Sequence, residues 1–433
     1  MLIALVLMVL LLTGVPIYVA LGLTSLIFFY TSGISMDILV RTLYSGVDQY
    51  ALISVTGFLL VGSLFDKAGI TDSLVRMVRR FMSSFKSGLA VVTIASCAIF
   101  AAVNGSGPAT VATIGGIMIP AMIRSRYRPK FAGAVAASGG ALGILIPPSN
   151  PFLMYGIIAN QSIAALFAAG AIPGLLMALA LSFTSAIAVR YLPGFATVGG
   201  AEEQQTQAPL GWREALATLW DAKWAISAVF LLMGGIYLGF FTPIEAAEVT
   251  IAYAIFIGMV VTRTMTWRDL YKALADTLKL SGTLIILVAA GFVFARLLTI
   301  EGAPQAMGGL IGGLSNNPQV ILLIIAAFLI FVGMWAETFS QIVVLVPIFL
   351  PVIMRLGIDP IQFGVVFVIC CEIGFLTPPF GANLFVAMKI SGNSLEELSW
   401  SVLPFVLTYI LVLILLIFVP DISLFLPRLL FGK

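Results

Sequence analysis

Side chains that could bind ions cluster in two short polar strings inside otherwise apolar sequence. The oxygen-bearing side chains are Asn104, Ser106 and Thr110 in the string NGSGPAT, and Glu337, Thr338, Ser340 and Gln341 in the string AETFSQ. Where a membrane helix is interrupted, freed backbone carbonyls and hydroxyl oxygens bind a hard cation such as sodium, and helix N-termini attract a carboxylate. We therefore interpret both strings as ion- or carboxylate-binding sites. The alternative is that their small residues only allow close helix packing.

A few charged side chains lie within apolar stretches, where burial is costly unless a partner or water is present. They are Glu245, Glu248, Arg296, Glu337 and Glu372. Arg296 is a candidate substrate ligand, and extension of its side chain to the membrane interface near Glu301 is the alternative. Glu245 follows Thr242-Pro243, which is typical of a helix start. We therefore expect Glu245 to cap a helix rather than to contact substrate.

The composition identifies a membrane protein. Of 433 residues, 61% are hydrophobic and 9% are charged, whereas a soluble domain carries about 25% charged residues. Apolar runs long enough to cross a bilayer, which takes about 20 residues of helix, recur along almost the whole chain. The expected fold class is an all-α polytopic membrane protein with no separate soluble domain. Residues 2–30 are expected to form a retained first helix, interrupted near Gly14 and Pro16, rather than a cleaved targeting segment.

Several classes of chemistry are excluded by the residue content. The chain has no histidine, which removes histidine metal sites and histidine general-base catalysis. It lacks the Gly-rich phosphate loop that ends in Lys-Ser/Thr, so ATP hydrolysis is not expected. Cys97, Cys370 and Cys371 lie in apolar stretches and are interpreted as packing residues. The net charge of +3 is too small to indicate nucleic-acid binding, and no cofactor is expected.

The sequence also shows an internal duplication. At an offset of 231 residues, prolines of the first half coincide with prolines of the second half. The pairs are Pro120 with Pro351, Pro129 with Pro360, Pro147 with Pro378, Pro148 with Pro379 and Pro173 with Pro404. Membrane transporters are often built from two such repeats, with the substrate and ion sites at the repeat interface on broken helices.

The first repeat is assigned to residues 1–190. Its uncharged stretch 88–123 lies between two basic segments, so both ends of that stretch are expected on the cytoplasmic side. The polar middle leaves two arms too short to cross a bilayer as helices, which indicates a re-entrant hairpin. The basic segment that precedes this hairpin, from Lys67 to Lys86, is expected to be a loop. Residues 131–158, interrupted by Pro147-Pro148, are expected to form a broken helix.

The second repeat is assigned to residues 223–433. It is expected to hold a matching hairpin at 319–354 and a second broken helix at 361–390. Residues 191–222 between the repeats form the most polar stretch of the chain and are interpreted as a linker. The end of this linker, from Trp212, has apolar residues at helical spacing and is expected to lie along the membrane surface.

The charges next to the two hairpins predict opposite orientations. The loop after the first hairpin carries four basic residues, Arg124, Arg126, Arg128 and Lys130, whereas the equivalent loop of the second repeat carries Arg355 against Asp359. Basic residues favour the cytoplasmic side, so the second hairpin is expected to enter from the outer face. The two repeats are therefore expected to have inverted topology.

Four strings, in this order, resemble the large membrane subunit of tripartite ATP-independent periplasmic (TRAP) transporters. They are GSGPATVATIGGIMIP from Gly105, GGALGILIPPS ending at Ser149, FFTPIEAA from Phe240 and GIDPIQFGVVFVICCEIGFLTPPFGANLF from Gly357. The resemblance covers nearly the whole chain and implies the elevator fold of the ion-transporter superfamily. It implies sodium-coupled secondary import of an organic acid across a bacterial inner membrane. Two partners are also implied, a small four-helix membrane subunit and a soluble periplasmic binding protein.

The resemblance further implies two sodium sites. The first comprises Asn104, Gly105, Ser106 and Gly107 with Pro147, Pro148 and Ser149; the second comprises Glu337, Thr338 and Ser340 with Thr377, Pro378, Pro379 and Asn383. The side chains expected to contact substrate are Thr110, Asn150, Arg296 and Gln341. Asn150-Pro151 departs from the family pattern, in which an apolar residue more often precedes this proline. Pro108 resembles the subset that carries sialic acid, while C4-dicarboxylates and other sugar acids stay open.

Three other functions fit part of the pattern. A transporter of the same repeat type could take up dicarboxylates or citrate alone, without a binding protein. An intramembrane aspartyl protease needs two aspartates at membrane depth, whereas Asp66, Asp72, Asp269 and Asp359 are all expected in loops. A passive channel accounts less well for broken helices in two inverted halves, because these suit alternating access.

Overall fold

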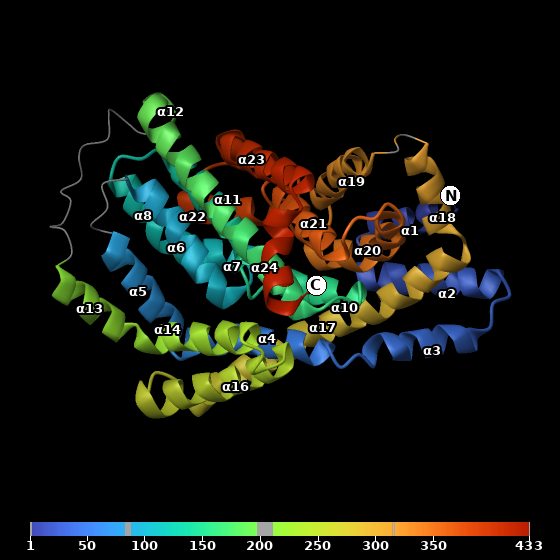
Figure 1. Ribbon diagram of the computed structural model, residues 1–433, viewed down its shortest axis with the longest axis horizontal. Helices are drawn as coiled ribbons and strands as arrows, with labels where there is room; N and C mark the ends of the chain where they lie inside the picture. Colours follow the sequence, from blue (N-terminus) through green and yellow to red (C-terminus); the bar gives the residue numbers. More distant parts are fainter. Residues whose placement is uncertain (1, 83–87, 197–210, 314, 316, 433) are drawn as a thin grey trace.

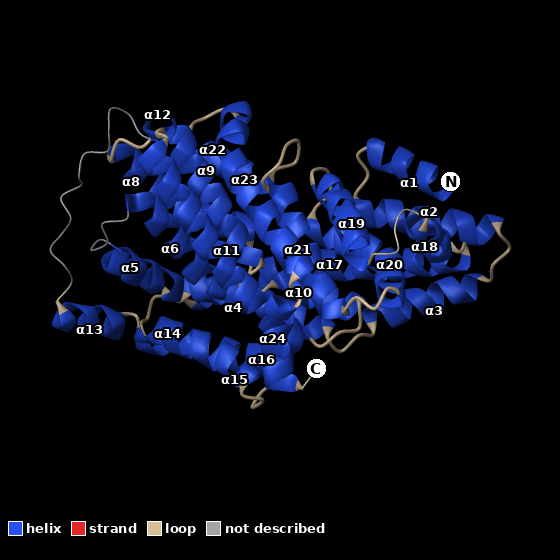
Figure 2. Ribbon diagram, turned by 45° about the horizontal axis from the view of Figure 1, so that its top comes forward, coloured by secondary structure: helices blue, strands red, loops and turns tan. Residues whose placement is uncertain are grey.

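The computed structural model describes residues 2–82, 88–196, 211–313, 315 and 317–432. Over these residues Figure 2 shows helices and loops and no strand. Residues 197–210 of the polar linker predicted at 191–222 lie outside the described residues.

The first repeat contains the helices α1 to α11, and α12 lies in the linker that follows. The helices before the hairpin are α1 (Leu2–Leu12), α2 (Ile17–Thr31), α3 (Met36–Val47), α4 (Leu52–Lys67) and α5 (Ile70–Met82). The hairpin consists of α6 (Gly88–Asn104), α7 (Gly107–Thr110), the π-helical turn η1 (Val111–Gly115) and α8 (Gly116–Arg124). The broken helix consists of α9 (Pro129–Gly140), the 3-10 turn η2 (Ala141–Ile144) and α10 (Asn150–Ile158), and is followed by α11 (Ile163–Tyr191) and α12 (Pro193–Ala196).

The second repeat follows the same order. The linker ends in α13 (Trp212–Asp221). The helices of the second repeat before its hairpin are α14 (Lys223–Val229), η3 (Phe230–Gly234), α15 (Gly235–Tyr237), α16 (Pro243–Phe256), η4 (Ile257–Val261), α17 (Trp267–Ile300) and α18 (Ala303–Gly312). The hairpin consists of α19 (Pro318–Gly333) and α20 (Thr338–Arg355), and the broken helix of α21 (Pro360–Phe375) and α22 (Ala382–Ser391). The last helices are α23 (Leu395–Phe418) and α24 (Asp421–Phe431).

Equivalent prolines have the same structural role in both repeats. Pro129 and Pro360 each lie in the first turn of a helix, α9 and α21, where the missing N–H removes no helical hydrogen bond. Pro147-Pro148 and Pro378-Pro379 lie in the two helix breaks, and both bonds are cis. Figure 1 shows the hairpin α6–α8 and the hairpin α19–α20 on opposite sides of the central helices α11 and α21. The fold is thus the predicted all-α membrane fold of two inverted repeats, each with a hairpin and a broken helix.

The helices form a scaffold and a core. In the scaffold, the 34-residue helix α17 packs against α2, α3 and α4, and α16 packs against α4. Figure 1 shows these helices along the lower edge of the molecule. In the core the repeats interlock, because α9 packs against α22 and α23, while α21 packs against α10 and α11. Each broken helix is therefore supported by the other repeat.

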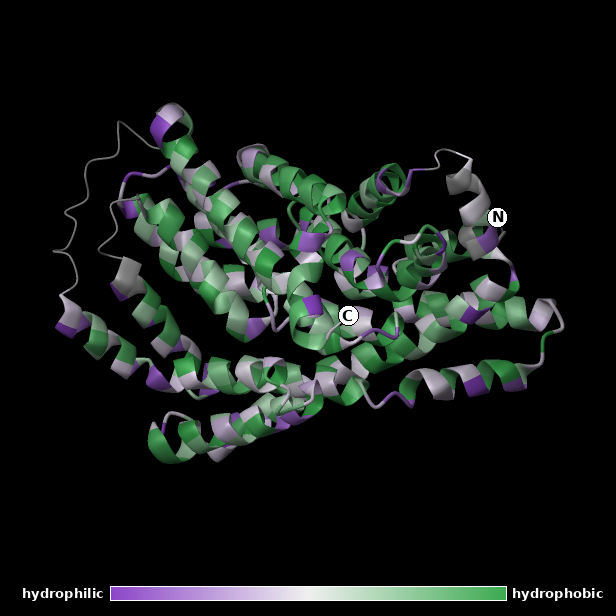
Figure 3. Cartoon of the chain, viewed as in Figure 1, coloured by the Kyte–Doolittle hydropathy of each residue, from purple (hydrophilic) through white to green (hydrophobic). Residues whose placement is uncertain are grey.

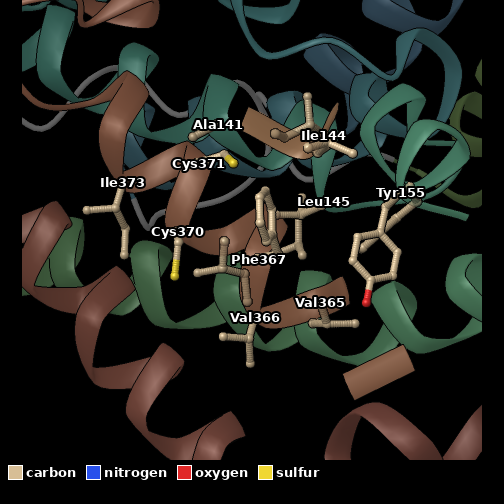
Figure 4. Close-up of a cluster of buried hydrophobic side chains, with 14 of the residues drawn as sticks. Ala141, Ile144, Leu145, Tyr155, Val365, Val366, Phe367, Cys370, Cys371 and Ile373 are labelled. Carbon is tan, nitrogen blue, oxygen red and sulfur yellow. The ribbon is translucent and has the colours of Figure 1, made fainter. Parts of the chain in front are cut away.

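Apolar side chains of both repeats share one buried cluster. Figure 4 shows Leu145 and Tyr155 of the first repeat beside Val366, Phe367 and Cys370 of the second. The phenol of Tyr155 donates a hydrogen bond to the Pro360 carbonyl oxygen at 2.6 Å, which satisfies its polar group at the start of α21. All three cysteines are buried and unpaired, which agrees with the predicted packing role.

The outer surface of the helix assembly is suited to lipid. Among the described residues, five helices are long and apolar enough to cross a membrane, or up to seven if two bent pairs each form one span. Figure 3 shows hydrophobic residues along most helices, with hydrophilic residues gathered toward helix ends and connections. This distribution matches the polytopic class predicted from composition.

Three local predictions are confirmed. The first apolar run is interrupted between α1 and α2, where Gly14 has φ +78° and Pro16 begins the next helix as its N-cap. Thr242 and Glu245 form a capping box at the start of α16, with the Thr242 backbone N–H donating to Glu245 Oε2 at 2.8 Å. The apolar spacing from Trp212 predicted a helix, and α13 forms there, with no buried residue and a bend of 66° to α14–α15.

The prediction of a loop from Lys67 to Lys86 is wrong, because residues 70–82 form helix α5. Ile70, Leu74 and Val78 are spaced four residues apart and are all buried, which gives α5 one apolar face. The basic residues occupy the rest of the helix, and Arg80 pairs with Glu214 of α13 at 3.0 Å. The run of basic residues concealed this helical periodicity.

Helices of the second repeat also extend beyond the predicted spans. α17 begins at Trp267, because Thr266 and Asp269 form a capping box there, so the prediction that Asp269 lies in a loop is wrong. α24 was not predicted, and it packs against α11 of the first repeat. Pro420 precedes α24 and Pro427 lies within it, and prolines at such spacing usually indicate that a helix has ended.

Candidate ion and substrate site

Four irregular segments carry the candidate site. In the first repeat, residues 105–106 between α6 and α7 are tip one, and residues 145–149 between η2 and α10 are break one. In the second repeat, residues 334–337 between α19 and α20 are tip two, and residues 376–381 between α21 and α22 are break two. Non-helical backbone persists at membrane depth where protein, water or an ion satisfies it, so these segments are where ligands are expected.

A cavity of about 400 Å³ lies among all four segments. Its lining residues near tip one are Asn104, Gly105, Ser106, Gly107, Pro108 and Ala109, and near break one Ile144, Asn150 and Pro151. Near tip two they are Glu337, Thr338 and Phe339, and near break two Phe375, Phe380 and Ala382. The scaffold adds Phe58, Leu59, Gly62, Ser63 and Asp66 from α4 and Leu280 from α17. Inverted repeats thus place their irregular segments around one space.

Tip one is packed tightly on break one through glycine backbone. Gly105 has φ +62°, a conformation that favours glycine, and a Cβ there would lie 2.7 Å from the Pro148 carbonyl oxygen. Gly143 is equally restricted, because its Cβ would lie 2.5 Å from the Ser106 carbonyl oxygen. The structure therefore brings together Gly105, Ser106 and Pro148, three residues of the first predicted sodium site.

The hydroxyl groups at this end have different partners. Thr110 Oγ1 donates to the Ser106 carbonyl oxygen at 2.8 Å. Ser149 Oγ donates to the Ile144 carbonyl oxygen and accepts from the Phe152 N–H at 3.3 Å. Ser106 is the N-cap of α7, but its side chain accepts no hydrogen bond from that helix. The Ser106 hydroxyl is therefore better placed to serve a ligand in the cavity than those of Thr110 and Ser149.

Tip two is fixed by hydrogen bonds. The Glu337 carboxylate is the N-cap of α20 and accepts from the Phe339 and Ser340 N–H groups at 3.1 and 3.3 Å. The Phe380 N–H of break two donates to the Met334 carbonyl oxygen at 3.0 Å, which ties the second break to the second tip. One Glu337 oxygen is thus used for capping, while the residue still lines the cavity.

The remaining residues of the second predicted sodium site are divided between the two tips. Thr338 and Ser340 are buried in the first turn of α20, and Thr377 Oγ1 donates to the Ile373 carbonyl oxygen at 2.6 Å. Asn383 lies on α22 and faces Gly107 beside tip one, where a Cβ on Gly107 would be 3.0 Å from Asn383 Oδ1. The contact of Asn383 with the other repeat could not be read from the sequence.

The four residues expected to contact substrate are not gathered in one place. Asn150 lines the cavity at the start of α10. Thr110 is buried with its hydroxyl on backbone, and Gln341 is buried with its Nε2 donating to the Ala336 carbonyl oxygen at 3.0 Å. Arg296 is exposed on α17 and is absent from the described lining of the cavity. Asn150 is thus the one of the four that a bound molecule in this cavity would touch.

Asp66 was predicted in a loop, and this prediction is wrong. Helix α4 continues to Lys67, and Asp66 lines the cavity, where its Oδ1 accepts from Thr71 Oγ1 at 2.6 Å. The lysine that follows suggested the end of the membrane segment. Gly62 and Ser63 of the same helix also line the cavity, and their spacing of three and four residues before Asp66 is the signal that could have identified this face.

The electrostatics of the cavity suit both a cation and an anion. Four helices, α7, α10, α20 and α22, present first-turn residues to it, so partly positive helix N-termini converge from both repeats. Among its described lining residues, Asp66 and Glu337 are the charged ones. Carboxylates and carbonyls can bind cations, while N-terminal amide groups can bind the carboxylate of a substrate.

Comparison with known proteins places these features in a family. The family described as "Tripartite ATP-independent periplasmic transporter, DctM component" matches residues 4–422. The C4-dicarboxylate TRAP transporter large permease protein DctM of Rhodobacter capsulatus is 34% identical over 439 residues, which cover 98% of each chain. The isethionate TRAP transporter permease protein DctMQ of Oleidesulfovibrio alaskensis is 35% identical over 416 residues. That match covers 96% of this chain, which spans 64% of the length of that relative.

A solved structure supports the same architecture. The crystal structure of the Alcanivorax borkumensis YdaH transporter, described as having an unusual topology, superposes with a TM-score of 0.66 over 88% of each chain. The sequence identity is 15%, so this likeness concerns the fold alone.

Proposed function

This chain belongs to the DctM family of TRAP transporter large permeases, and from that membership we propose that it imports an organic acid by sodium-coupled secondary active transport. It is a multi-pass protein of the inner membrane. The relatives compared above are named for isethionate and for C4-dicarboxylates, both of which are organic anions. We propose a carboxylate as the substrate, such as a C4-dicarboxylate, a sialic acid or another sugar acid.

One observation carries the proposal. Both tips, break two and the residues that flank break one line a single cavity of about 400 Å³, within the range of a small-molecule site. Its polar lining consists of helix starts, amide and hydroxyl oxygens and two carboxylates. These groups support reversible binding of ions and a small anion.

The substrate carboxylate is proposed to bind at the helix N-termini near tip one. Asn150 begins α10 and Gly107 begins α7, and both residues line the cavity. Since no side chain caps α7, its first-turn N–H groups can donate to a ligand. The absence of Lys and Arg among the described lining residues leaves these backbone dipoles as the groups that attract an anion.

Sodium is proposed to bind on both sides of the substrate. The first ion is assigned to tip one and break one, where the Ser106 hydroxyl and the carbonyl groups of both segments lie close together. The second is assigned to tip two and break two, with Glu337 providing negative charge. Two cations next to one anion would offset its charge, which favours binding the ions and the substrate together.

Alternating access is proposed to follow an elevator path. The cavity has a core wall, formed by the tips and breaks, and a scaffold wall, formed mainly by α4. Movement of the core along α4 and α17 would carry the cavity across the membrane without unpacking the interlocked broken helices. The small four-helix membrane subunit would hold the scaffold in place, and a periplasmic binding protein would deliver the substrate.

Reconstitution with and without each partner tests the proposal. The chain is placed in liposomes alone, with the small membrane subunit, and with both that subunit and the binding protein loaded with labelled substrate. We expect uptake only with all components and an inward sodium gradient, and none when potassium replaces sodium. Robust uptake by the chain alone would favour a stand-alone carboxylate transporter. Uptake by the complete system without sodium would overturn the coupling.

A further inference from the structure

Glu372 and Asn383 form a buried polar pair in the core. Glu372 lies on α21 and Asn383 on α22, and neither has any solvent-exposed surface. Asn383 Nδ2 donates a hydrogen bond to Glu372 Oε2 at 3.2 Å. The other two oxygens, Glu372 Oε1 and Asn383 Oδ1, have no hydrogen-bond partner in the described part of the chain. A buried acceptor without a partner is costly, so two in one pair call for an explanation.

Both unpaired oxygens face the same residue of the first repeat. A Cβ on Gly107 would lie 3.0 Å from Asn383 Oδ1 and 3.3 Å from Glu372 Oε1. The Asn383 amide nitrogen lies 3.2 Å from the same Cβ position, so tip one can approach the pair this closely only with glycine at position 107. The contact joins the two unpaired oxygens and the amide nitrogen of the second repeat to backbone of the first.

The pair lacks a positive partner among side chains. The ion pairs recorded between described residues are Arg41 with Asp37, Arg80 with Glu214 and Arg428 with Asp421, all at exposed positions. Asn383 is the hydrogen-bond partner recorded for the Glu372 carboxyl group among the described residues. A carboxyl group in a water-free interior is either protonated or accompanied by a compensating cation.

We propose that Glu372 Oε1 and Asn383 Oδ1 bind a sodium ion beside Gly107, at a cation site that joins the two repeats. A carboxylate and an amide oxygen are suitable ligands for a hard cation, and backbone or water oxygen completes the coordination. The inference rests on the sodium coupling proposed above and adds Glu372 as a ligand. It also assigns Asn383 to a site shared with tip one, so that ion binding in the second repeat fixes the hairpin of the first.

Sodium titration of thermal stability tests the site. The full chain with its membrane subunit in nanodiscs is titrated with NaCl, with choline chloride keeping the ionic strength constant. In Glu372→Gln the new amide can pair with Asn383 in both directions, so folding is preserved while the charge is removed. We expect the sodium concentration for half-maximal stabilisation to rise by at least about tenfold. The control Glu248→Gln removes an exposed glutamate of the scaffold helix α16 and should leave this sodium concentration unchanged.

A second variant keeps the test decisive if the first does not fold. Gly107→Ala places a methyl group in the proposed ion position and retains the carboxylate, and it should weaken sodium binding in the same way. Unchanged sodium affinity in a folded Glu372→Gln protein would overturn the proposal. If the same variant also loses a pH dependence of stability, the Glu372 carboxyl group binds a proton instead of sodium. If the unaltered protein shows no sodium effect, the proposed sodium coupling itself fails.

Discussion

Tip one and tip two occupy equivalent places in the two repeats but are held by different contacts. Tip one rests on glycine backbone, with Gly105 and Gly143 against the carbonyl oxygens of Pro148 and Ser106. Tip two is held by the Glu337 carboxylate at the start of α20 and by the hydrogen bond from the Phe380 N–H to tip two. Break one is buried, whereas Phe380 of break two is 40% exposed.

This difference bears on where an anion can bind. At tip two the N–H groups at the start of α20 already bind the carboxylate of Glu337, so they are less available to an anionic ligand. At tip one no side chain caps α7, and its N–H groups can bind an anion. A duplicated fold can thus give each copy a different electrostatic preference while the helix positions stay the same.

The largest expected effect concerns orientation. Arg126→Cys and Gly357→Cys place thiols at equivalent loop positions, 231 residues apart, in a background without Cys97, Cys370 and Cys371. Because the repeats are inverted, an impermeant maleimide should label one position from the cytoplasmic side and the other from the periplasmic side. Labelling of right-side-out and inverted vesicles gives the answer. Labelling of both positions from the same side would contradict the inverted arrangement.

The second largest effect is expected from a methyl group added where each tip makes its closest contact. Gly143→Ala and Gly374→Ala are equivalent substitutions, and each Cβ would lie about 2.5 Å from backbone of its own hairpin, at Ser106 and at Gly333. Backbone cannot move aside as a side chain can, so we expect each variant to lose at least about 1–3 kcal/mol of stability and most transport. Thermal unfolding and uptake in proteoliposomes measure both. A variant with normal stability and uptake would show that its tip does not need this close contact.

Truncation of the tip side chains should separate stability from ion binding. Glu337→Ala removes the cap of α20 and should cost about 0.5–2 kcal/mol of unfolding free energy. Ser106→Ala removes no capping bond, so stability should change little while the sodium requirement for uptake rises. The two variants are compared by thermal unfolding and by sodium titration of uptake. Equal stability losses would remove the proposed difference between the tips.

The smallest expected effect has the opposite sign. Gly116 begins α8, and a Cβ there would meet nothing within 4 Å. Gly116→Ala should therefore stabilise the protein by about 0.4–1 kcal/mol, mainly by restricting the unfolded chain, and should leave transport intact. It serves as the matched control for Gly143→Ala in the same repeat. Loss of transport in Gly116→Ala would show that the hairpin tolerates no added side chain, whatever the local space.

The sequence predicts the positions of the helices and breaks better than it predicts the contacts between them. Proline pairs such as Pro147-Pro148 and Pro378-Pro379 determine where helices break, because proline lacks an N–H and fixes its backbone. The helix α5 was missed because its basic residues hide a single apolar face. The pairing of Gly107 with Asn383 has no local signal at all, since it joins residues of different repeats. The duplication itself misleads there, because the 231-residue offset pairs Asn383 with Phe152, which has no polar group.

The bend between α3 and α4 has a consequence for how such a protein can diverge. These two helices correspond to the single helix α17, since Met36 and Trp267 begin them 231 residues apart. The pair is bent by 43°, and α4 contributes a whole face to the cavity, whereas α17 contributes Leu280 to its described lining. Mutations on α4 can therefore reshape the space for the cargo without altering the residues proposed to hold the coupling ions. In evolutionary terms, the α4 side of the cavity is free to change with the substrate, while the hairpins and breaks stay under selection for ion coupling.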